Sequence, residues 1–382
     1  MKFIDIFDKK TWKPNWDKVF SIAEFEDMRT CKQSQEWHKE GNVDTHTKLV
    51  AEAMYVYLTN KLCVKPSNDP YYIMMMSAAI CHDLGKPSTT EYDRTKKDYG
   101  SKNHGMAGSV ITRRIFFDEE INLREKVCYM VRRHMVLHHI FDDEKKAEKQ
   151  LIALSNGFVS VEQMVILNMC DSLGSRNDIE TSEHVSERIN KIRNLALSLG
   201  CLNNRYKEPK KKENGDFTMY VMIGVPGAGK SYYVDRHFKG RYPIISRDII
   251  RNEIGLKGEK TLGNKSQEDK VTNIFNKRLI ECCENKRTFV IDNTNVRKKY
   301  REEYKELAKE YNPRVVYVYV EGPSLRTIKK RRDGMMPLDV IDRMWENFDF
   351  PEYGECDVLI IEKQKEKLIK KILKKILPFK TK

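Results

Sequence analysis

Residues 219–231 read Met219-Tyr-Val-Met-Ile-Gly-Val-Pro-Gly-Ala-Gly-Lys-Ser231, an apolar run that leads straight into a glycine-rich loop. From Gly224 to Ser231 the loop fits the pattern GxxxxGK[ST] at every fixed position. Glycines let successive backbone N–H groups turn toward phosphate oxygens, and the N-terminus of a following helix adds partial positive charge. The stretch therefore predicts a strand, a phosphate-binding loop and a helix, which together begin an α/β domain with a parallel sheet.

The loop also predicts which side chains bind a nucleotide. Lys230 can reach the β- and γ-phosphates, and the hydroxyl of Ser231 can hold Mg²⁺. The rest of the predicted phosphate cradle consists of Gly224, Pro226, Gly227, Ala228 and Gly229. The predicted cofactors of this domain are ATP or another NTP, together with Mg²⁺.

A second apolar run, Pro243–Ile245, is followed by Ser246-Arg-Asp-Ile-Ile-Arg251. Asp248 and Arg251 are three residues apart, so a helix that starts here presents both on one face. At the edge of a parallel sheet, beside a phosphate-binding loop, an Asp can accept the proton of an alcohol and an Arg can bind an acceptor phosphate. The alternative is that Asp248 only caps the helix and Arg251 is exposed.

Two later stretches add polar side chains to the same predicted site. Asp292 directly follows the apolar run Thr288–Ile291 and is the predicted outer partner of the magnesium ion. A basic stretch, Lys329-Lys-Arg-Arg332, closes a helix, and Arg331 or Arg332 is predicted to neutralise charge on the transferred phosphate. The alternative for this basic helix end is simple exposure to solvent.

Periodicity divides the chain into two domains. The predicted strands of the second domain are Met219–Ile223, Pro243–Ile245, Phe289–Ile291 and Val315–Val320, and they alternate with helices such as Glu268–Cys282 and Lys298–Glu310. Apolar residues of the first half recur at helical spacing in Thr47–Leu62, Tyr71–Ile80 and Glu125–Val136. The segment 203–216 is almost free of apolar residues. We predict a basic linker there, between an all-helical domain (1–202, core about 25–177) and the α/β domain (217–382).

The helical half contains histidines and aspartates suited to metal binding. An apolar helix, Met74–Ile80, runs into Cys81-His-Asp83, and burying adjacent His and Asp side chains without a cation costs free energy. The predicted ligands are His46, His82, Asp83, His104, His134 and Asp171, with Asp83 placed to bridge two ions. Imidazole and carboxylate together suit Mn, Co, Ni or Fe. His138 and His139 are predicted to be outer or surface residues.

The N-terminal half resembles the HD phosphohydrolase superfamily, and in particular the HD domain of bacterial tRNA nucleotidyltransferases. The resemblance covers roughly Phe25 to Asn177 and rests on Glu36-Trp-His-Lys-Glu-Gly-Asn-Val-Asp-Thr-His-Thr47, His82-Asp-Leu-Gly-Lys-Pro87, Asn103-His-Gly105, Arg133-His-Met135 and Asp171. It implies that His46, His82, Asp83 and Asp171 hold one metal ion, and that His104 and His134 provide for a second.

The C-terminal half, from Met219 to about Asp357, resembles the kinase domain of polynucleotide 5′-kinases. The matching motifs are GVPGAGKS, SRDIIR, DNTN and the lid arginine followed by Pro-Leu-Asp-Val-Ile. The resemblance implies that Lys230 and Ser231 act on the NTP phosphates and magnesium, that Asp248 is the general base on a 5′-OH, and that Arg251 binds the acceptor 3′-phosphate. Many relatives carry two acids where this chain has Asp248-Ile249, which leaves Asp248 as the single candidate base.

Together the halves resemble the HD–polynucleotide kinase enzymes that heal broken nucleic-acid ends. The resemblance implies that the HD domain hydrolyses 2′,3′-cyclic phosphate and terminal 2′- or 3′-phosphate ends, while the kinase domain phosphorylates the 5′-OH. The implied substrate is RNA, with DNA left open, and a separate ligase would seal the ends. Two alternatives stay open: an HD nucleotidase fused to a small-molecule kinase, and an NTP-regulated nucleic-acid-binding switch.

Composition favours a polyanionic partner. The chain has 70 Lys and Arg against 56 Asp and Glu, a net charge of +14. Residues 362–382 hold nine lysines, and apolar residues between Leu368 and Leu377 recur at helical spacing, which predicts an amphipathic helix. The sequence lacks the roughly 20-residue apolar stretch of a membrane span, and its nine cysteines form no CxxC pair. We expect a cytoplasmic protein with reduced cysteines and no membrane partner.

Overall fold

The computed structural model describes residues 1–177, 180–205, 216–256, 264–334 and 337–364. Contacts divide the chain into two compact units, 1–211 and most of 212–382, and each is described by itself. The predicted linker, 203–216, spans this division, and most of it lies outside the described residues. The predicted lysine-rich helix near the C-terminus also lies outside them.

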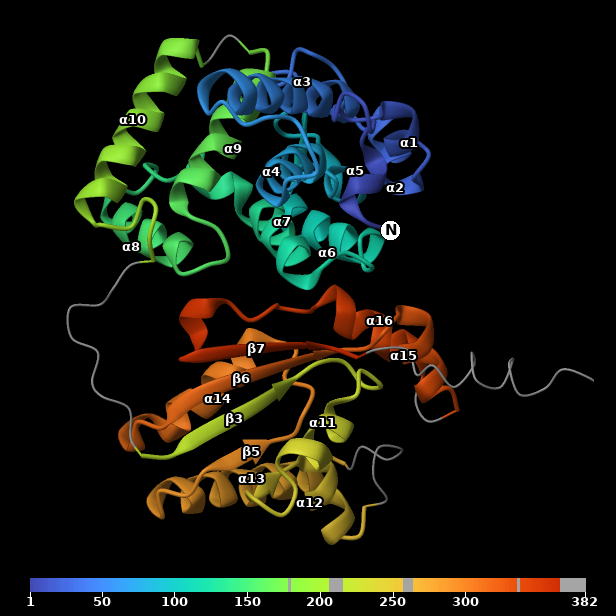
Figure 1. Cartoon of the computed structure of the whole chain (residues 1–382), viewed down its shortest axis with the longest axis vertical. Coiled ribbons are helices and arrows are strands. Elements are labelled where there is room, and N and C mark those ends of the chain that lie inside the picture. Colours follow the sequence, from blue (N-terminus) through green and yellow to red (C-terminus); the bar gives the residue numbers. More distant parts are fainter. Residues whose placement is uncertain (178–179, 206–215, 257–263, 335–336, 365–382) are drawn as a thin grey trace, which may run out of the picture. The chain divides into compact units, whose positions relative to one another are not determined.

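The N-terminal unit is built mainly from helices, as predicted (Figure 1). Its α-helices are α1 (Trp16–Phe20), α2 (Ala23–Glu26), α3 (Val43–Val56), α4 (Pro70–Cys81), α5 (Lys86–Thr89), α6 (His104–Ile115), α7 (Ile121–Arg133), α8 (Glu144–Ser155), α9 (Val161–Gly174) and α10 (Ser182–Ser198). Short 3₁₀ turns lie at Phe3–Ile6, Asp27–Arg29 and His134–Leu137, and a π-helical turn (Tyr57–Lys61) extends α3.

The helix α4 forms the centre of this unit. Asp69 caps its first turn, and Pro70 stands at the first helical position, where a missing N–H costs nothing. Every side chain from Tyr72 to Cys81 is buried, as expected of a helix that is apolar on all sides. The helix packs against α3, α7 and α9 and ends at His82. The chain thus carries His82 and Asp83 into the interior of the unit.

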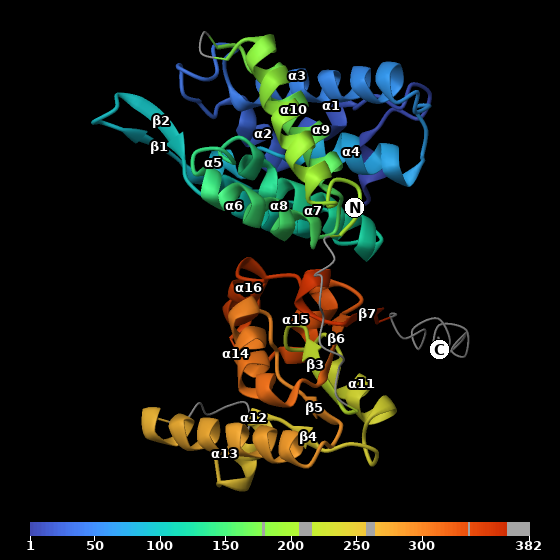
Figure 2. The same ribbon diagram turned by 90° about the vertical axis from the view of Figure 1, so that its left-hand side faces the viewer.

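One hairpin departs from the all-helical prediction. The strands β1 (Thr90–Asp93) and β2 (Asp98–Ser101) pair antiparallel, and Figure 2 shows them beside α5 and α6. No residue of either strand is fully buried. They therefore lack the alternation of apolar and polar residues that marks a half-buried strand, which is why periodicity gave no signal for them.

The second unit has the predicted parallel α/β fold. Its sheet consists of five parallel strands in the order β4-β5-β3-β6-β7. The strands are β3 (Thr218–Ile223), β4 (Ile244–Ile245), β5 (Phe289–Ile291), β6 (Arg314–Glu321) and β7 (Val358–Lys363). The α-helices are α11 (Lys230–His237), α12 (Arg247–Glu253), α13 (Lys265–Glu284), α14 (Lys298–Ala308), α15 (Leu325–Arg332) and α16 (Leu338–Glu346), and a short 3₁₀ turn lies at Lys309–Tyr311. A further 3₁₀ turn, Tyr353–Glu355, falls at a division between the two units.

Helices cover both faces of this sheet. On one face, Phe238 just after α11 packs with Met222 and Val318. On the other face, the guanidinium of Arg301 in α14 lies 5.7 Å from the centre of the Tyr317 ring. A parallel sheet buried in this way places its ligand site where the carboxyl ends of the strands meet. The edge strand β7 was not predicted, because its short apolar run gives way at once to charged residues.

The structure also bears on the predictions about the cysteines and about membrane-spanning segments. All nine cysteines are free thiols, and seven of them are buried. Within the described ranges, no helix combines the length and the apolar character needed to cross a bilayer.

Candidate metal centre and nucleotide site

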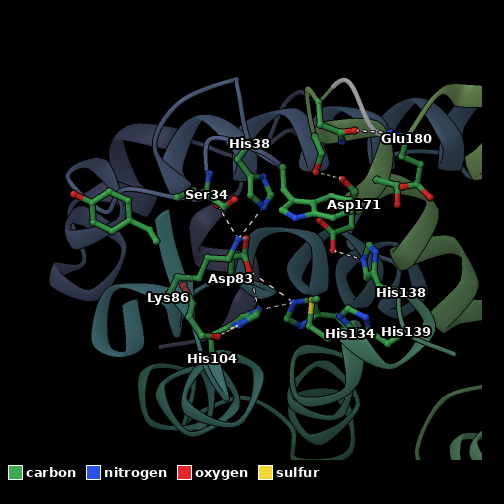
Figure 3. A pocket seen from close by; sticks show the side chains of 18 of the residues that line it. Ser34, His38, Asp83, Lys86, His104, His134, His138, His139, Asp171 and Glu180 are labelled. Carbon is green, nitrogen blue, oxygen red and sulfur yellow. Dashed lines mark hydrogen bonds and ion pairs between the residues drawn. The ribbon is translucent and has the colours of Figure 1, made fainter. Parts of the chain in front are cut away.

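The structure brings all six predicted metal ligands together in the N-terminal unit. Figure 3 shows Asp83, His104, His134 and Asp171 among them. Each side chain is at least nine-tenths buried. They come from different elements: His46 from α3, His82 and Asp83 from the end of α4, His104 from the start of α6, His134 from the end of α7 and Asp171 from α9. Their donor atoms form two groups, His46 with His82 and Asp171, and Asp83 with His104 and His134, each within 4.8 Å.

Asp83 faces both groups with different oxygens. Its Oδ2 lies 3.2 Å from Nε2 of His82, while its Oδ1 lies 3.3 Å from Nε2 of His104. Oδ1 of Asp171 lies 2.9 Å from Nε2 of His46. A carboxylate that directs one oxygen toward each group could act as a common ligand of two neighbouring metal ions.

In each of the four histidine rings, Nδ1 has a polar partner that orients the ring so that Nε2 faces the centre. Nδ1 of His82, His104 and His134 each lie 2.7–2.9 Å from a backbone carbonyl three residues earlier. Nδ1 of His46 lies 2.9 Å from a carboxylate oxygen of Glu40. A proton on Nδ1 that is donated outward leaves the lone pair of Nε2 free for a metal, the usual outer support of a histidine ligand.

These residues fit a divalent metal ion. The Nε2 atoms of His46 and His82 are 3.2 Å apart, and those of His104 and His134 are 3.0 Å apart. Two lone pairs cannot face each other at such distances without a cation or a proton between them. Neither oxygen of Asp83 makes a hydrogen bond of good geometry. The donor set of nitrogen and carboxylate oxygen suits Mn, Co, Ni or Fe.

Burial and local charge act differently on the two groups of candidate ligands. Although burial favours the neutral ring, the carboxylates of Asp83 and Asp171 raise the pKa of His82 to about 10. Burial lowers the pKa of His134 to about 3. Burial opposes ionisation of Asp83 as well, but His82 and Lys86 hold the pKa of this carboxyl well below its usual range. The carboxylates thus favour positive charge beside His82, whereas the His134 ring is neutral and keeps a lone pair for a metal ion.

Glycines let α6 approach closely enough to place His104. A Cβ on Gly85 would lie 2.0 Å from the carbonyl oxygen of His104 and 2.5 Å from the backbone nitrogen of Gly108. A Cβ on Gly105 would lie 2.9 Å from the carbonyl oxygen of Arg132, near the end of α7. The close packing of α5, α6 and α7 thus brings His104 beside His134.

Four further residues lie beside the predicted ligands: His38, Glu40, Lys86 and His138. Of these, only His138 had a predicted role at the metal site. Glu40, with a fully buried carboxylate, supports His46 and lies 2.8 Å from Nδ1 of His38. Nζ of Lys86 lies 2.7 Å from Asp83. Nε2 of His138 lies 2.9 Å from Asp171, so the predicted outer position applies to this histidine. His139, in contrast, is exposed and faces Asp142.

A pocket of about 690 Å³ opens beside the cluster. Asp83, His104, His134 and Asp171 line its inner part, and Figure 3 shows Lys86 and His138 there as well. Its volume falls in the range of roughly 300–1,000 Å³ that is typical of small-molecule sites. A substrate can therefore reach the predicted ligands.

In the second unit, the loop Gly224–Ser231 connects β3 to α11. Gly227 and Gly229 have φ angles of +82° and +110°, values that favour glycine. The buried Lys230 donates from Nζ to the carbonyl oxygens of Gly224 and Val225, at 2.9 and 3.3 Å. The backbone thus has the conformation that a phosphate cradle requires, and Lys230 lies over it.

Asp248 and Arg251 lie together at the start of α12. Nη1 of Arg251 donates to Oδ1 of Asp248 at 2.7 Å, and its Nε and Nη2 donate to the two oxygens of Glu268, both at 2.9 Å. Arg251 is therefore not the exposed residue of the alternative interpretation. Glu268 was not predicted, because it lies on α13 and no local pattern connects it to α12.

The remaining predicted residues lie around the phosphate loop. Burial raises the pKa of Asp292, and the ammonium of Lys230 opposes this shift, so the two side chains are near each other. Nη1 of Arg331 donates to the carbonyl oxygen of Gly227 at 2.9 Å. Arg332 also reaches the loop, since a Cβ on Gly227 would lie 3.2 Å from its Cγ. Both candidate lid arginines thus adjoin the cradle.

Two family models match the chain. The model described as HD domain matches residues 56–157, and the model described as AAA domain matches residues 219–351. The chain therefore combines an HD domain with a P-loop kinase domain, as the sequence motifs predicted. Both are enzyme domains, one a metal-dependent hydrolase type and the other a phosphotransferase type that uses a nucleotide and Mg²⁺.

Similarity to known proteins is partial. An L-seryl-tRNA(Sec) kinase from Methanococcus maripaludis is 27% identical over 141 residues, which are 35% of this chain and 53% of the relative, so the chain spans about half of that protein's length. A chain from a Pnkp1/Rnl/Hen1 RNA repair complex is 19% identical, with a TM-score of 0.32, over 38% of this chain and 50% of that one. The APS kinase of Mycobacterium tuberculosis is 14% identical, with a TM-score of 0.29, over 42% of this chain and 96% of that one.

Proposed function

We propose that this chain heals broken RNA ends. Its HD domain hydrolyses 2′,3′-cyclic phosphate and terminal 2′- or 3′-phosphate, and its kinase domain transfers the γ-phosphate of an NTP to a 5′-OH. The observation that carries the proposal is the presence, in one chain, of a cluster of six candidate metal ligands and of a P-loop domain in which Arg251 pairs with Asp248. Ribonuclease cleavage commonly leaves a cyclic phosphate and a 5′-OH, and these two chemistries correspond to those two ends.

In the HD domain, His46, His82, Asp83 and Asp171 would hold one metal ion, and His104 and His134 would provide for a second. A bound divalent cation would supply Lewis acidity toward the phosphate and activate a water molecule. Lys86, 2.7 Å from Asp83 at the pocket wall, is placed to offset the charge of a bound phosphate. His138 holds Asp171 in position through the hydrogen bond to its second oxygen.

In the kinase domain, Lys230 and Ser231 would bind the NTP phosphates and Mg²⁺, and Asp292 would support the ion. An acceptor phosphate that takes over Nη1 of Arg251 would release Asp248, whose carboxylate then accepts the proton of the 5′-OH. Glu268 keeps the other side of the Arg251 guanidinium fixed during this exchange. We assign the role of lid to Arg331 or Arg332.

The acceptor is the point on which alternative functions differ. The similarity to an L-seryl-tRNA(Sec) kinase favours a second candidate, a hydroxyl carried by an aminoacyl-tRNA. A nucleoside or another small molecule is a third. The net charge of +14 favours the two RNA acceptors over a small metabolite. A separate ligase would then join the healed ends.

Labelling from ATP with a labelled γ-phosphate distinguishes these acceptors. The protein is offered a 5′-OH oligoribonucleotide, a nucleoside and seryl-tRNA in parallel. We expect label on the oligonucleotide. Label only on the nucleoside or only on seryl-tRNA would overturn the proposed acceptor, and no label on any of them would overturn the kinase assignment.

A further inference from the structure

The pocket beside the metal centre extends well beyond the space that one phosphate group fills. Besides the inner residues, it is lined by Trp37 and Tyr99, two aromatic side chains from different elements. Trp37 comes from the loop before α3, and Tyr99 comes from β2. The pocket therefore offers room and flat apolar surface for the part of a substrate that adjoins the phosphate.

Trp37 is 46% exposed, although tryptophan gains more than most residues from burial. A single exposed apolar residue needs no explanation. Trp37 is different because the exposed ring belongs to the wall of the pocket that contains the metal ligands. Within the described residues it also makes no hydrogen bond or ring contact that would explain its position.

The loop that presents Trp37 is held on both sides. Before it, Ser34 donates to Asp98 of β2, and the backbone N–H of Gln35 donates to the same carboxylate at 3.2 Å. After it, the backbone N–H of Lys39 donates to the carbonyl oxygen of Arg176 at 2.7 Å. A fixed backbone lowers the entropy lost when a ligand binds to the ring.

We propose that Trp37 stacks on the nucleobase of the terminal nucleotide, whose ribose carries the phosphate to be removed. This inference rests on the proposed function and names the part of the RNA end that the HD pocket recognises. Proteins commonly bind unpaired RNA bases by stacking them on aromatic side chains, and the interaction tolerates every base because each one has a π face. Trp37 thus binds the terminal base whatever its identity and takes no part in the chemical step.

The test compares two oligoribonucleotides of the same sequence that both end in 2′,3′-cyclic phosphate. One has adenine on its last ribose, and the other has an abasic last ribose. We expect the full-length protein to hydrolyse the adenine end with the higher kcat/KM, mainly through a lower KM. Loss of one stacked base typically weakens binding on the order of 10- to 100-fold.

Substitutions then assign this preference to the ring. Trp37→Ala should lose the preference and hydrolyse both ends at the wild-type abasic rate, whereas Trp37→Phe should retain most of it. Leu197→Ala, at another exposed apolar residue, on α10 and outside the pocket lining, should behave as wild type. Melting temperatures check that all variants are folded.

Three outcomes are distinguishable. If the wild-type protein hydrolyses both ends equally well, or if Trp37→Ala keeps the full preference for adenine, the role of Trp37 is wrong while the phosphoesterase assignment stands. If the wild-type protein hydrolyses neither end with any of the four candidate metals, the proposed function of the HD domain fails. A preference lost in Trp37→Ala and kept in Trp37→Phe supports the stacking role.

Discussion

Glu40 is the side chain on which His46 depends for its orientation. The other three candidate histidine ligands each face a backbone carbonyl three residues earlier in the chain, but His46 faces a buried carboxylate from the preceding loop. Although burial opposes ionisation, hydrogen bonds from His38 and His46 hold the pKa of Glu40 well below its usual range. The second oxygen of Glu40 accepts the backbone N–H of Arg176 at 2.8 Å. One carboxylate thus connects the first ligand to the segment after α9.

We predict that Glu40→Ala weakens metal binding by about 10- to 100-fold, the usual effect of losing an outer support. The measurement is metal content after dialysis against graded chelator, followed by elemental analysis. Glu36→Ala removes an exposed carboxylate from the same loop and serves as the matched control. Equal metal retention in the two variants would show that His46 needs no such support.

Asp248 carries the clearest prediction for the kinase site. An amide cannot accept the proton of the 5′-OH, so Asp248→Asn should lower the transfer rate by roughly 10²- to 10⁴-fold. Binding of the NTP should be unchanged, because the hydrogen bond of Asp248 is to Arg251 on its own helix. Asp269→Asn, at an exposed carboxylate on α13, is the control. A near-normal transfer rate in Asp248→Asn would place the general base elsewhere.

Only some of the residues at the two sites could be predicted from the sequence. Contiguous motifs led to His82, Asp83, Lys230 and Asp248, because each pattern implies a chemical role over a few positions. Glu268 could not be predicted, because it lies 17 residues from Arg251 in the sequence and on a different helix. Glu40 lies inside the motif Glu36–Thr47, but the order of residues does not show which acidic side chain of this motif faces His46.

At the level of elements, the metal centre depends on how closely three helices approach. The backbone at Gly85 leaves no space for a side chain against α6. Gly85→Ala should therefore displace His104, with a cost of about 1–3 kcal/mol from overpacking. We expect reduced metal content and HD activity, with normal kinase activity in the same preparation. Gly100→Ala, where a Cβ meets nothing within 4 Å, is the control, and full metal content in Gly85→Ala would contradict this explanation.

A buried ion group fixes α6 against α7. Arg113 of α6 and Arg124 of α7 both contact the carboxylate of Glu125, at 2.8 and 2.9 Å. Although burial opposes ionisation, the two arginines lower the pKa of Glu125. Its folded pKa lies below the ordinary value of 4.5, so this stabilisation is complete above about pH 4.5 and is lost as the pH falls through the folded pKa.

Glu125→Ala should lower the free energy of unfolding of the N-terminal unit by about 3–5 kcal/mol, because it leaves two buried arginines without their shared partner. Glu148→Ala, on the exposed surface of α8, should change it little. Denaturant unfolding of the full chain, followed by a probe in the HD domain, measures both. A small effect of Glu125→Ala would mean that water or another acid compensates the arginines.

For the whole molecule, the fold class could be predicted from the sequence, but some of its elements could not. The parallel sheet and the helical unit follow from long periodic segments and from the glycine loop that starts α11. The hairpin β1–β2 shows no alternation of apolar and polar residues. The apolar run of the edge strand β7 is only four residues long and is followed at once by charged residues, so neither element was predicted. Asp98 of the same hairpin accepts hydrogen bonds from the loop that presents Trp37. An element that was not predicted thus supports the pocket beside the predicted metal ligands.

The central claim is that one chain carries two independent activities toward the two ends of a broken RNA. The candidate metal ligands and the predicted kinase residues have no residue in common, and they belong to different compact units. The most direct test offers one RNA, with a 5′-OH and a 2′,3′-cyclic phosphate, to the wild-type protein, to Lys230→Ala and to Asp83→Ala, and scores both ends of each product. We predict that Lys230→Ala fails only to phosphorylate the 5′ end and that Asp83→Ala fails only to open and remove the cyclic phosphate. Loss of both activities in either folded variant, or a wild-type protein that modifies neither end, would contradict the claim.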